Sequence, residues 1–109
     1  MTAPKHPCAA CGLLVFDEPS GSYAICPVCG WEDDPVQLAH PSLAGGANRE
    51  SLRVAQPIAA PRAAEAIRGG ARARDPRWRP LEAADLRADG ELVTPGSGPY
   101  WTRGVHTPA

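Results

Sequence analysis

The stretch that decides the fold reads CAACG at residues 8–12 and CPVCGW at residues 26–31. It holds all four cysteines of the 109-residue chain, as two C-x-x-C pairs with fourteen residues between them. Two cysteines three positions apart can bind the same ion when the backbone between them turns tightly, and four thiolates complete a tetrahedral zinc site. The spacing therefore predicts a structural metal site formed by Cys8, Cys11, Cys26 and Cys29.

A glycine follows each pair, at Gly12 and at Gly30. The residue after a metal-binding C-x-x-C turn often needs a positive φ, which glycine adopts without a steric penalty. The repetition favours two zinc knuckles over a chance arrangement of cysteines. The metal is expected to be Zn²⁺, with iron as the alternative, because a four-cysteine site does not by itself separate the two.

The segment between the pairs is typical of a β-hairpin. Residues 13–16 (LLVF) are strand formers, residues 17–22 (DEPSGS) are turn formers, and residues 23–25 (YAI) lead into the second pair. A hairpin of these two strands would bring both knuckles to one end, as in a zinc-ribbon or rubredoxin-like fold. Trp31 is expected to pack in the core beside the site.

The composition indicates a chain with little apolar material. It has 13 prolines, 11 glycines and six aromatic residues. An ordered region of about 45 residues is near the size at which an apolar core stops sufficing and a metal is needed. We therefore expect a fold that depends on its metal.

The N-terminal residues and the cysteine content predict a cytoplasmic protein. The chain shows neither a signal peptide nor an apolar run long enough to span a membrane. Four cysteines without a secretory signal favour a metal in a reducing cytoplasm. The net charge of −1 divides into −4 over residues 1–50 and +3 over residues 51–109.

Three adjacent carboxylates, Glu32, Asp33 and Asp34, follow the second pair. The run is interpreted as a solvated acidic face, because charge runs usually lie in water. Asp33 or Asp34 could also cap a turn that begins at Pro35. If the face is free, it is a candidate docking surface for a basic protein partner.

The rest of the chain predicts short helices. Asn48 or Ser51 could cap a helix of about two turns that begins at Leu52 and is cut short by Pro57. Further short helices are expected over residues 61–68 and 80–88, and the final residues, with Tyr100 and Trp101, are interpreted as flexible. The expected fold class is thus a small metal-stabilised β-hairpin with two zinc knuckles and short helices, whose C-terminal half is irregular or partly disordered.

Three regions are expected on this basis. Residues 1–7 form a polar lead-in, residues 8–56 the cysteine-rich metal-binding domain, and residues 57–109 an extension rich in proline, alanine and arginine. Within the extension, residues 72–79 place Trp78 among arginines, a composition that can contact nucleic acid. Nearby acidic residues dilute this charge.

No set of residues suits catalysis, since the chain has no Ser–His–Asp candidate, no phosphate-binding loop and no spare cysteine, so an enzyme is not expected.

With these residues identified, the chain resembles the bacterial cysteine-rich CPCC family. The resemblance covers residues 8–56 and is carried by CAACG at 8–12, by DEPSGSYAICPVCGWEDDPVQ at 17–37 and by GGANRESL at 45–52. It implies a small metal-binding fold and no settled activity. Two departures stand out: Ala9 and Ala10 replace the proline and the extra cysteine of the family's first knuckle, and Pro57 and Pro61 interrupt the region where the family would continue in a longer helix.

A second resemblance is to rubredoxin-type domains, through CPVCG and the earlier C-x-x-C-G. It implies iron in place of zinc, and electron transfer. The leading hypothesis is a small zinc-binding module that binds a protein partner. A rubredoxin-like electron carrier is the alternative, and a nucleic-acid-binding zinc ribbon is a further one.

Overall fold

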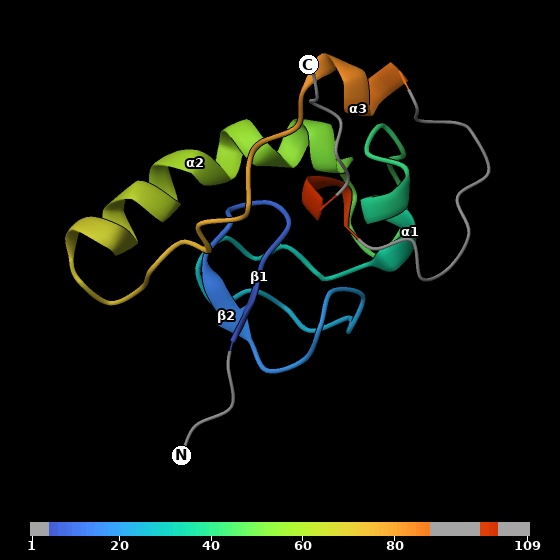
Figure 1. Ribbon diagram of the computed structural model, residues 1–109. Helices are drawn as coiled ribbons and strands as arrows, with labels where there is room; N and C mark the ends of the chain where they lie inside the picture. Colours follow the sequence, from blue (N-terminus) through green and yellow to red (C-terminus); the bar gives the residue numbers. More distant parts are fainter. Residues whose placement is uncertain (1–4, 88–98, 103–109) are drawn as a thin grey trace.

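The structure is a computed structural model that describes residues 5–87 and 99–102. Its elements are β1 (His6–Pro7), β2 (Leu14–Phe16), α1 (Pro35–Ala39), α2 (Leu52–Arg68), α3 (Ala83–Arg87) and a 3-10 helix, η1 (Tyr100–Thr102). Figure 1 shows α2 lying across one side of the β1–β2 ribbon. Within the described ranges, no helix has both the length and the apolar character needed to cross a membrane.

Each cysteine pair lies in a tight turn with the same backbone pattern. In the first cysteine turn (residues 8–12), the Cys8 amide donates to Leu13 O at 2.9 Å and the Gly12 amide donates to Cys8 O at 2.7 Å. In the second cysteine turn (residues 26–30), the corresponding bonds join Cys26 to Trp31 at 2.8 Å and Gly30 to Cys26 at 3.0 Å. Gly12 has φ 78° and Gly30 has φ 84°, so the expected positive φ is confirmed.

The β-hairpin is built from different segments than expected. β2 pairs antiparallel with β1, in the register His6 to Phe16 and Pro7 to Leu14, and not with residues 23–25. Ile25 instead forms an isolated bridge with Glu32 across the second cysteine turn. The predicted pairing is wrong because each cysteine turn reverses the chain itself, so the strand before it pairs with the strand after it.

The acidic run is structural, and its interpretation as a solvated face is wrong for two of its three residues. Asp33 is 1% exposed, and its carboxylate accepts hydrogen bonds at 2.9 Å from the Gly21 amide, the Ser22 amide and the Ser22 hydroxyl. Asp34 is 5% exposed and caps α1, as one of the alternatives predicted, by accepting from the Val36 amide at 2.7 Å. Backbone amides hydrogen-bond these two carboxylates in place of water, so the carboxylates are not available to a partner.

We therefore expect Asp33→Lys to destabilise the protein severely. The change places a cation among three donors that bound a carboxylate, and an unpaired buried charge costs about 3–5 kcal/mol. The melting temperature measured by circular dichroism should fall by about 15 °C or more. Glu18→Lys is the matched control, because Glu18 is exposed and undergoes the same change of charge. Equal melting temperatures for the two variants would contradict the structural role of Asp33.

Helix α2 is continuous, and the prediction of two short helices broken by proline is wrong. Leu52–Arg68 forms one helix of 17 residues that contains both Pro57 and Pro61, with Ser51 as its N-cap. Each internal proline costs about 3 kcal/mol relative to alanine. Both prolines are exposed, so the carbonyl groups that lose a helical donor lie on the solvent side. The opposite face is buried at positions spaced by about one helical turn: Leu52, Gln56, Ala59 and Ala63.

The chain after α2 returns to the first cysteine turn. Between α2 and α3 it is irregular, as expected, apart from an isolated bridge at Arg74, but it packs against the rest of the fold. The Leu14 amide donates to Ala73 O and the Asp75 amide donates to Gly12 O, both at 2.9 Å. Tyr100 was expected in a flexible tail, but it is fully buried in the core. Residues 88–98 and 103–109 lie outside the described part of the chain. They include the end of the helix expected over residues 80–88 and most of the tail expected to be flexible.

The core forms around the cysteines and not around a large apolar sheet. Three of the four cysteines are at most 2% exposed and belong to one cluster with Leu13, Trp31 and Leu52. Burial of Trp31 agrees with its expected role in packing, and Leu52 anchors α2 as its position predicted. The division expected at residues 7 and 56 stays a prediction, although α2 runs across residue 56 without a break.

Candidate metal centre

The four cysteines predicted as ligands are brought together. Their sulfur atoms all lie within 4.8 Å of one another, with 3.6 Å between the Sγ atoms of Cys8 and Cys29 and 3.8 Å between those of Cys11 and Cys26. Tetrahedral coordination with metal–sulfur bonds of about 2.3 Å separates neighbouring sulfurs by about 3.8 Å. A disulfide would need about 2.05 Å, and all four cysteines are free. The cluster could therefore hold one metal ion.

The second cysteine turn also directs backbone donors at a sulfur. The amides of Val28 and Cys29 both lie 3.4 Å from Cys26 Sγ. Such N–H···S contacts stabilise a thiolate, which is the form that binds a metal. The turn thus prepares Cys26 for coordination through its backbone alone, without a charged side chain.

The pKa values of the four thiols shift in opposite directions, because the sulfurs lie within hydrogen-bonding distance of one another. Hydrogen bonding with Cys11, followed by that with Cys26 and Cys29 and by burial, raises the pKa of the Cys8 thiol far above its ordinary value. Hydrogen bonding with Cys26 raises the pKa of Cys11. Hydrogen bonds from Cys11 lower the pKa values of Cys26 and Cys29. Four thiols this close disfavour one another's ionisation in the absence of a cation, and a divalent cation bound between them would stabilise the thiolate forms.

Trp78 and Arg74 cover the first cysteine turn from outside. The indole Nε1 of Trp78 donates to Ala9 O at 3.1 Å, and the Arg74 Nε donates to Cys11 O at 3.4 Å. A Cβ at Gly12 would lie 2.5 Å from the Trp78 ring, so this contact requires glycine as strictly as the φ does. The residues predicted as a nucleic-acid patch thus include two that support the first cysteine turn.

Gln37 is the main supporting residue that the sequence did not reveal. It is fully buried, and its Nε2 donates to the carbonyl groups of Leu43, Asn48 and Glu50 at 3.0–3.1 Å. Its Oε1 accepts from the Asn48 amide at 3.0 Å. The Asn48 side chain in turn pairs with the backbone N and O of Glu32, both at 2.8 Å. Gln37 therefore ties loop 41–50 to the strand that leaves the second cysteine turn.

Cys29 differs from the other three cysteines in its exposure. It is half-buried, and with Gly30 and Trp31 it lines a cavity of about 170 Å³ between the second cysteine turn and α2. The indole nitrogen of Trp31 is buried without a hydrogen-bond partner among the described residues. Reagents in solution should therefore approach the cluster through Cys29.

We accordingly expect Cys29 to react first when the metal-loaded protein meets a small excess of N-ethylmaleimide. The other three sulfurs are at most 2% exposed and should follow only after the cluster opens. Peptide mapping by mass spectrometry at short times measures the order. A sample unfolded in guanidinium with a chelator is the control, in which the four cysteines should react at similar rates. Modification of Cys8 or Cys11 before Cys29 would contradict the conclusion that Cys29 is the most accessible of the four cysteines.

The fold and the sulfur cluster define a small cysteine-cluster protein with a site that could hold one metal ion. The family model described as Cysteine-rich CPCC matches residues 6–77, about two thirds of the chain, and the protein belongs to this family. The resemblance seen in residues 8–56 is thereby confirmed, and the family region extends beyond it through α2. None of the curated proteins compared with the chain matches it.

Proposed function

We propose that the protein is a zinc-binding module in which Cys8, Cys11, Cys26 and Cys29 hold one structural Zn²⁺ and the surrounding fold binds a protein partner. The observation that carries the proposal is the spacing of the four sulfurs, which all lie within 4.8 Å of one another, with 3.6 Å between Cys8 and Cys29 and 3.8 Å between Cys11 and Cys26. Four thiolates leave no coordination position for water or substrate. The metal therefore stabilises the fold, and we do not assign the protein an enzymatic role.

The reducing cytoplasm is the compartment that suits this proposal. All four cysteines are free, and zinc–thiolate sites require thiols that are not oxidised to disulfides. The partner surface must differ from the one that the acidic run suggested, because Asp33 and Asp34 are buried.

Metal analysis of the purified protein, together with its visible absorption spectrum, tests the proposal. We expect one zinc per chain and a colourless solution. The variant Cys26→Ser should bind less zinc, since it removes one of the four thiolates. A stoichiometry near zero in protein purified under reducing conditions without chelator would contradict a zinc module.

A rubredoxin-like electron carrier remains the second candidate. The same sulfur geometry suits iron, and the two amide contacts to Cys26 Sγ resemble the hydrogen bonds that tune the potential of iron–thiolate centres. Red colour from ferric thiolate and a reversible redox wave would favour it. The acidic run at residues 32–34 offers little surface to a basic redox partner, because two of its three carboxylates are internal.

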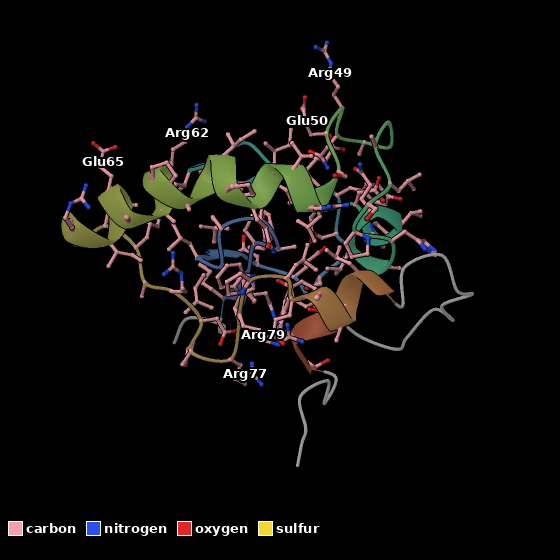
Figure 2. All side chains as sticks on the ribbon, turned by 90° about the horizontal axis from the view of Figure 1, so that it is seen from above. Arg49, Glu50, Arg62, Glu65, Arg77 and Arg79 are labelled. Carbon is pink, nitrogen blue, oxygen red and sulfur yellow. The ribbon has the colours of Figure 1, made fainter. Side chains whose placement is uncertain are left out.

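Nucleic-acid binding is less well supported. Arg79 forms a two-point ion pair with Asp85, at 2.8 and 3.1 Å, and Arg77 lies 3.6 Å from Asp75. Figure 2 shows that the outer side of α2 carries Arg62 and Glu65 on the same side, so positive charge is interrupted there as well. A gel shift that is absent, or that does not weaken with salt, would remove this candidate.

A further inference from the structure

A groove of about 680 Å³ lies between α2 and residues 74–86, beside the first cysteine turn. Its walls include Pro57 from α2 and Trp78, Leu81 and Leu86 from the returning chain. Figure 2 shows Arg62 and Arg79 on opposite sides of α2, and Arg79 lines the groove. A volume of this size is within the range of ligand sites, which is about 300–1,000 Å³.

The described part of the groove wall carries positive charge. Among the residues that the structure describes, Arg53, Arg74 and Arg79 line it, and no aspartate or glutamate does. Arg79 is neutralised by its ion pair with Asp85. Arg53 and Arg74 are exposed and form no ion pair with any described residue, so two guanidinium groups are left to attract an anion.

The apolar part of the groove limits what the anion can be. Trp78, Leu81 and Leu86 are all half-buried and leave part of their apolar surface open to the groove. A free phosphate would leave this surface in water. An occupant that combines carboxylates with an aliphatic or aromatic side chain would use both features, since guanidinium groups bind carboxylates through two parallel hydrogen bonds and burial of apolar surface adds free energy.

We propose that this groove binds a short acidic peptide segment of a partner protein, with one apolar side chain inserted against Trp78 and Leu81 and flanking carboxylates bound by Arg53 and Arg74. A nucleic acid fits less well. Two arginines without an ion pair neutralise few phosphates, whereas they suffice for the two carboxylates that flank one apolar side chain.

The groove depends on the first cysteine turn, so this inference deepens the proposed function and rests on it. Trp78 packs on Gly12 and donates to Ala9 O, while Arg74 donates to Cys11 O and lies over the Trp78 ring at 5.5 Å. Any change that opens the first cysteine turn removes the surface that orients both side chains. The acidic partner is therefore expected to bind only the metal-loaded protein.

Selection from a random dodecapeptide library displayed on phage, with the metal-loaded full chain as bait, tests the proposal. We expect the enriched sequences to share an aliphatic or aromatic residue flanked by aspartate or glutamate. The best peptide, labelled with fluorescein, is then titrated by fluorescence anisotropy. Its binding should weaken about tenfold or more for Arg53→Glu, and should weaken further as sodium chloride is raised.

Arg62→Glu is the matched control, because Arg62 is also exposed on α2 but does not line the groove. Its affinity should stay within about twofold of the parent protein. Metal content and near-ultraviolet circular dichroism are measured for each variant, so that misfolding or failure of the metal proposal is recognised separately from failure of the groove. Parent-like affinity of the Arg53→Glu variant, or enriched sequences without acidic residues, would overturn the proposal. Binding of an oligothymidylate probe that Arg53→Glu abolishes, without peptide binding, would assign the groove to nucleic acid and overturn it too.

Discussion

Removal of the metal is expected to abolish the near-ultraviolet circular dichroism of the buried aromatic residues and the cooperative thermal transition. The reason is the position of the cluster: Cys8, Cys11 and Cys26 are at most 2% exposed and belong to the core that contains Trp31 and Tyr100. Structural zinc in small domains contributes about 10–16 kcal/mol of apparent binding free energy at neutral pH. This is as large as the whole net stability of an ordinary domain, about 5–15 kcal/mol.

The measurement is a titration with a zinc chelator under reducing conditions, followed by circular dichroism, and then by restoration with a stoichiometric amount of zinc. The same chelator saturated with zinc beforehand serves as the control, because it cannot take up the metal of the protein. A chelated protein that keeps its aromatic signal and its thermal transition would show that the apolar contacts suffice. The protein would then fold without the metal, and the metal would add only to its stability.

Gln37→Leu is expected to cause the second largest loss. Leucine has a similar volume, but it leaves the carbonyl groups of Leu43, Asn48 and Glu50 without their donor and the Asn48 amide without its acceptor. Each buried polar group left unsatisfied costs about 1–3 kcal/mol. The sum is about 4 kcal/mol or more, and the melting temperature should fall by about 15 °C or more.

Thermal denaturation of the metal-loaded variant, with metal content checked beforehand, measures this loss. Val36→Ala is the control on the same helix, because Val36 is 49% exposed and its side chain supports no polar group. It should change the melting temperature by only a few degrees. A Gln37→Leu variant as stable as Val36→Ala would mean that loop 41–50 finds other partners or water at little cost.

Local signals in the sequence were sufficient for the parts of the site that local geometry determines. The C-x-x-C-G spacing predicted the two turns and the positive φ of Gly12 and Gly30, because those requirements arise within five residues. The caps at Asp34 and Ser51 follow from the same kind of signal, since a cap bonds an amide two or three residues away.

Contacts between distant segments could not be predicted in this way. Asp33 is internal because the amides of residues 21 and 22 meet it after the loop folds back, a contact invisible in a run of three carboxylates. Pro57 and Pro61 are tolerated because their helix buries its other face, so packing outweighs the propensity on which the prediction relied. Gln37 gave no signal, because a single glutamine looks like an ordinary surface residue.

The hydroxyl of Tyr100 makes the folding unit longer than the family region. It donates to Arg79 O and accepts from Gln56 Nε2 at 2.8 Å, which joins the second turn of α2 to a residue beyond the family match, which ends at residue 77. A fragment trimmed to the matched residues would lose the Tyr100 ring from the core. Gln56 would keep its bond to Ala9 O but would lose its bonds to the Tyr100 hydroxyl and the Leu81 amide. Anyone who expresses the protein by homology alone should therefore retain residues through Thr102, or expect a product that is prone to proteolysis and aggregation.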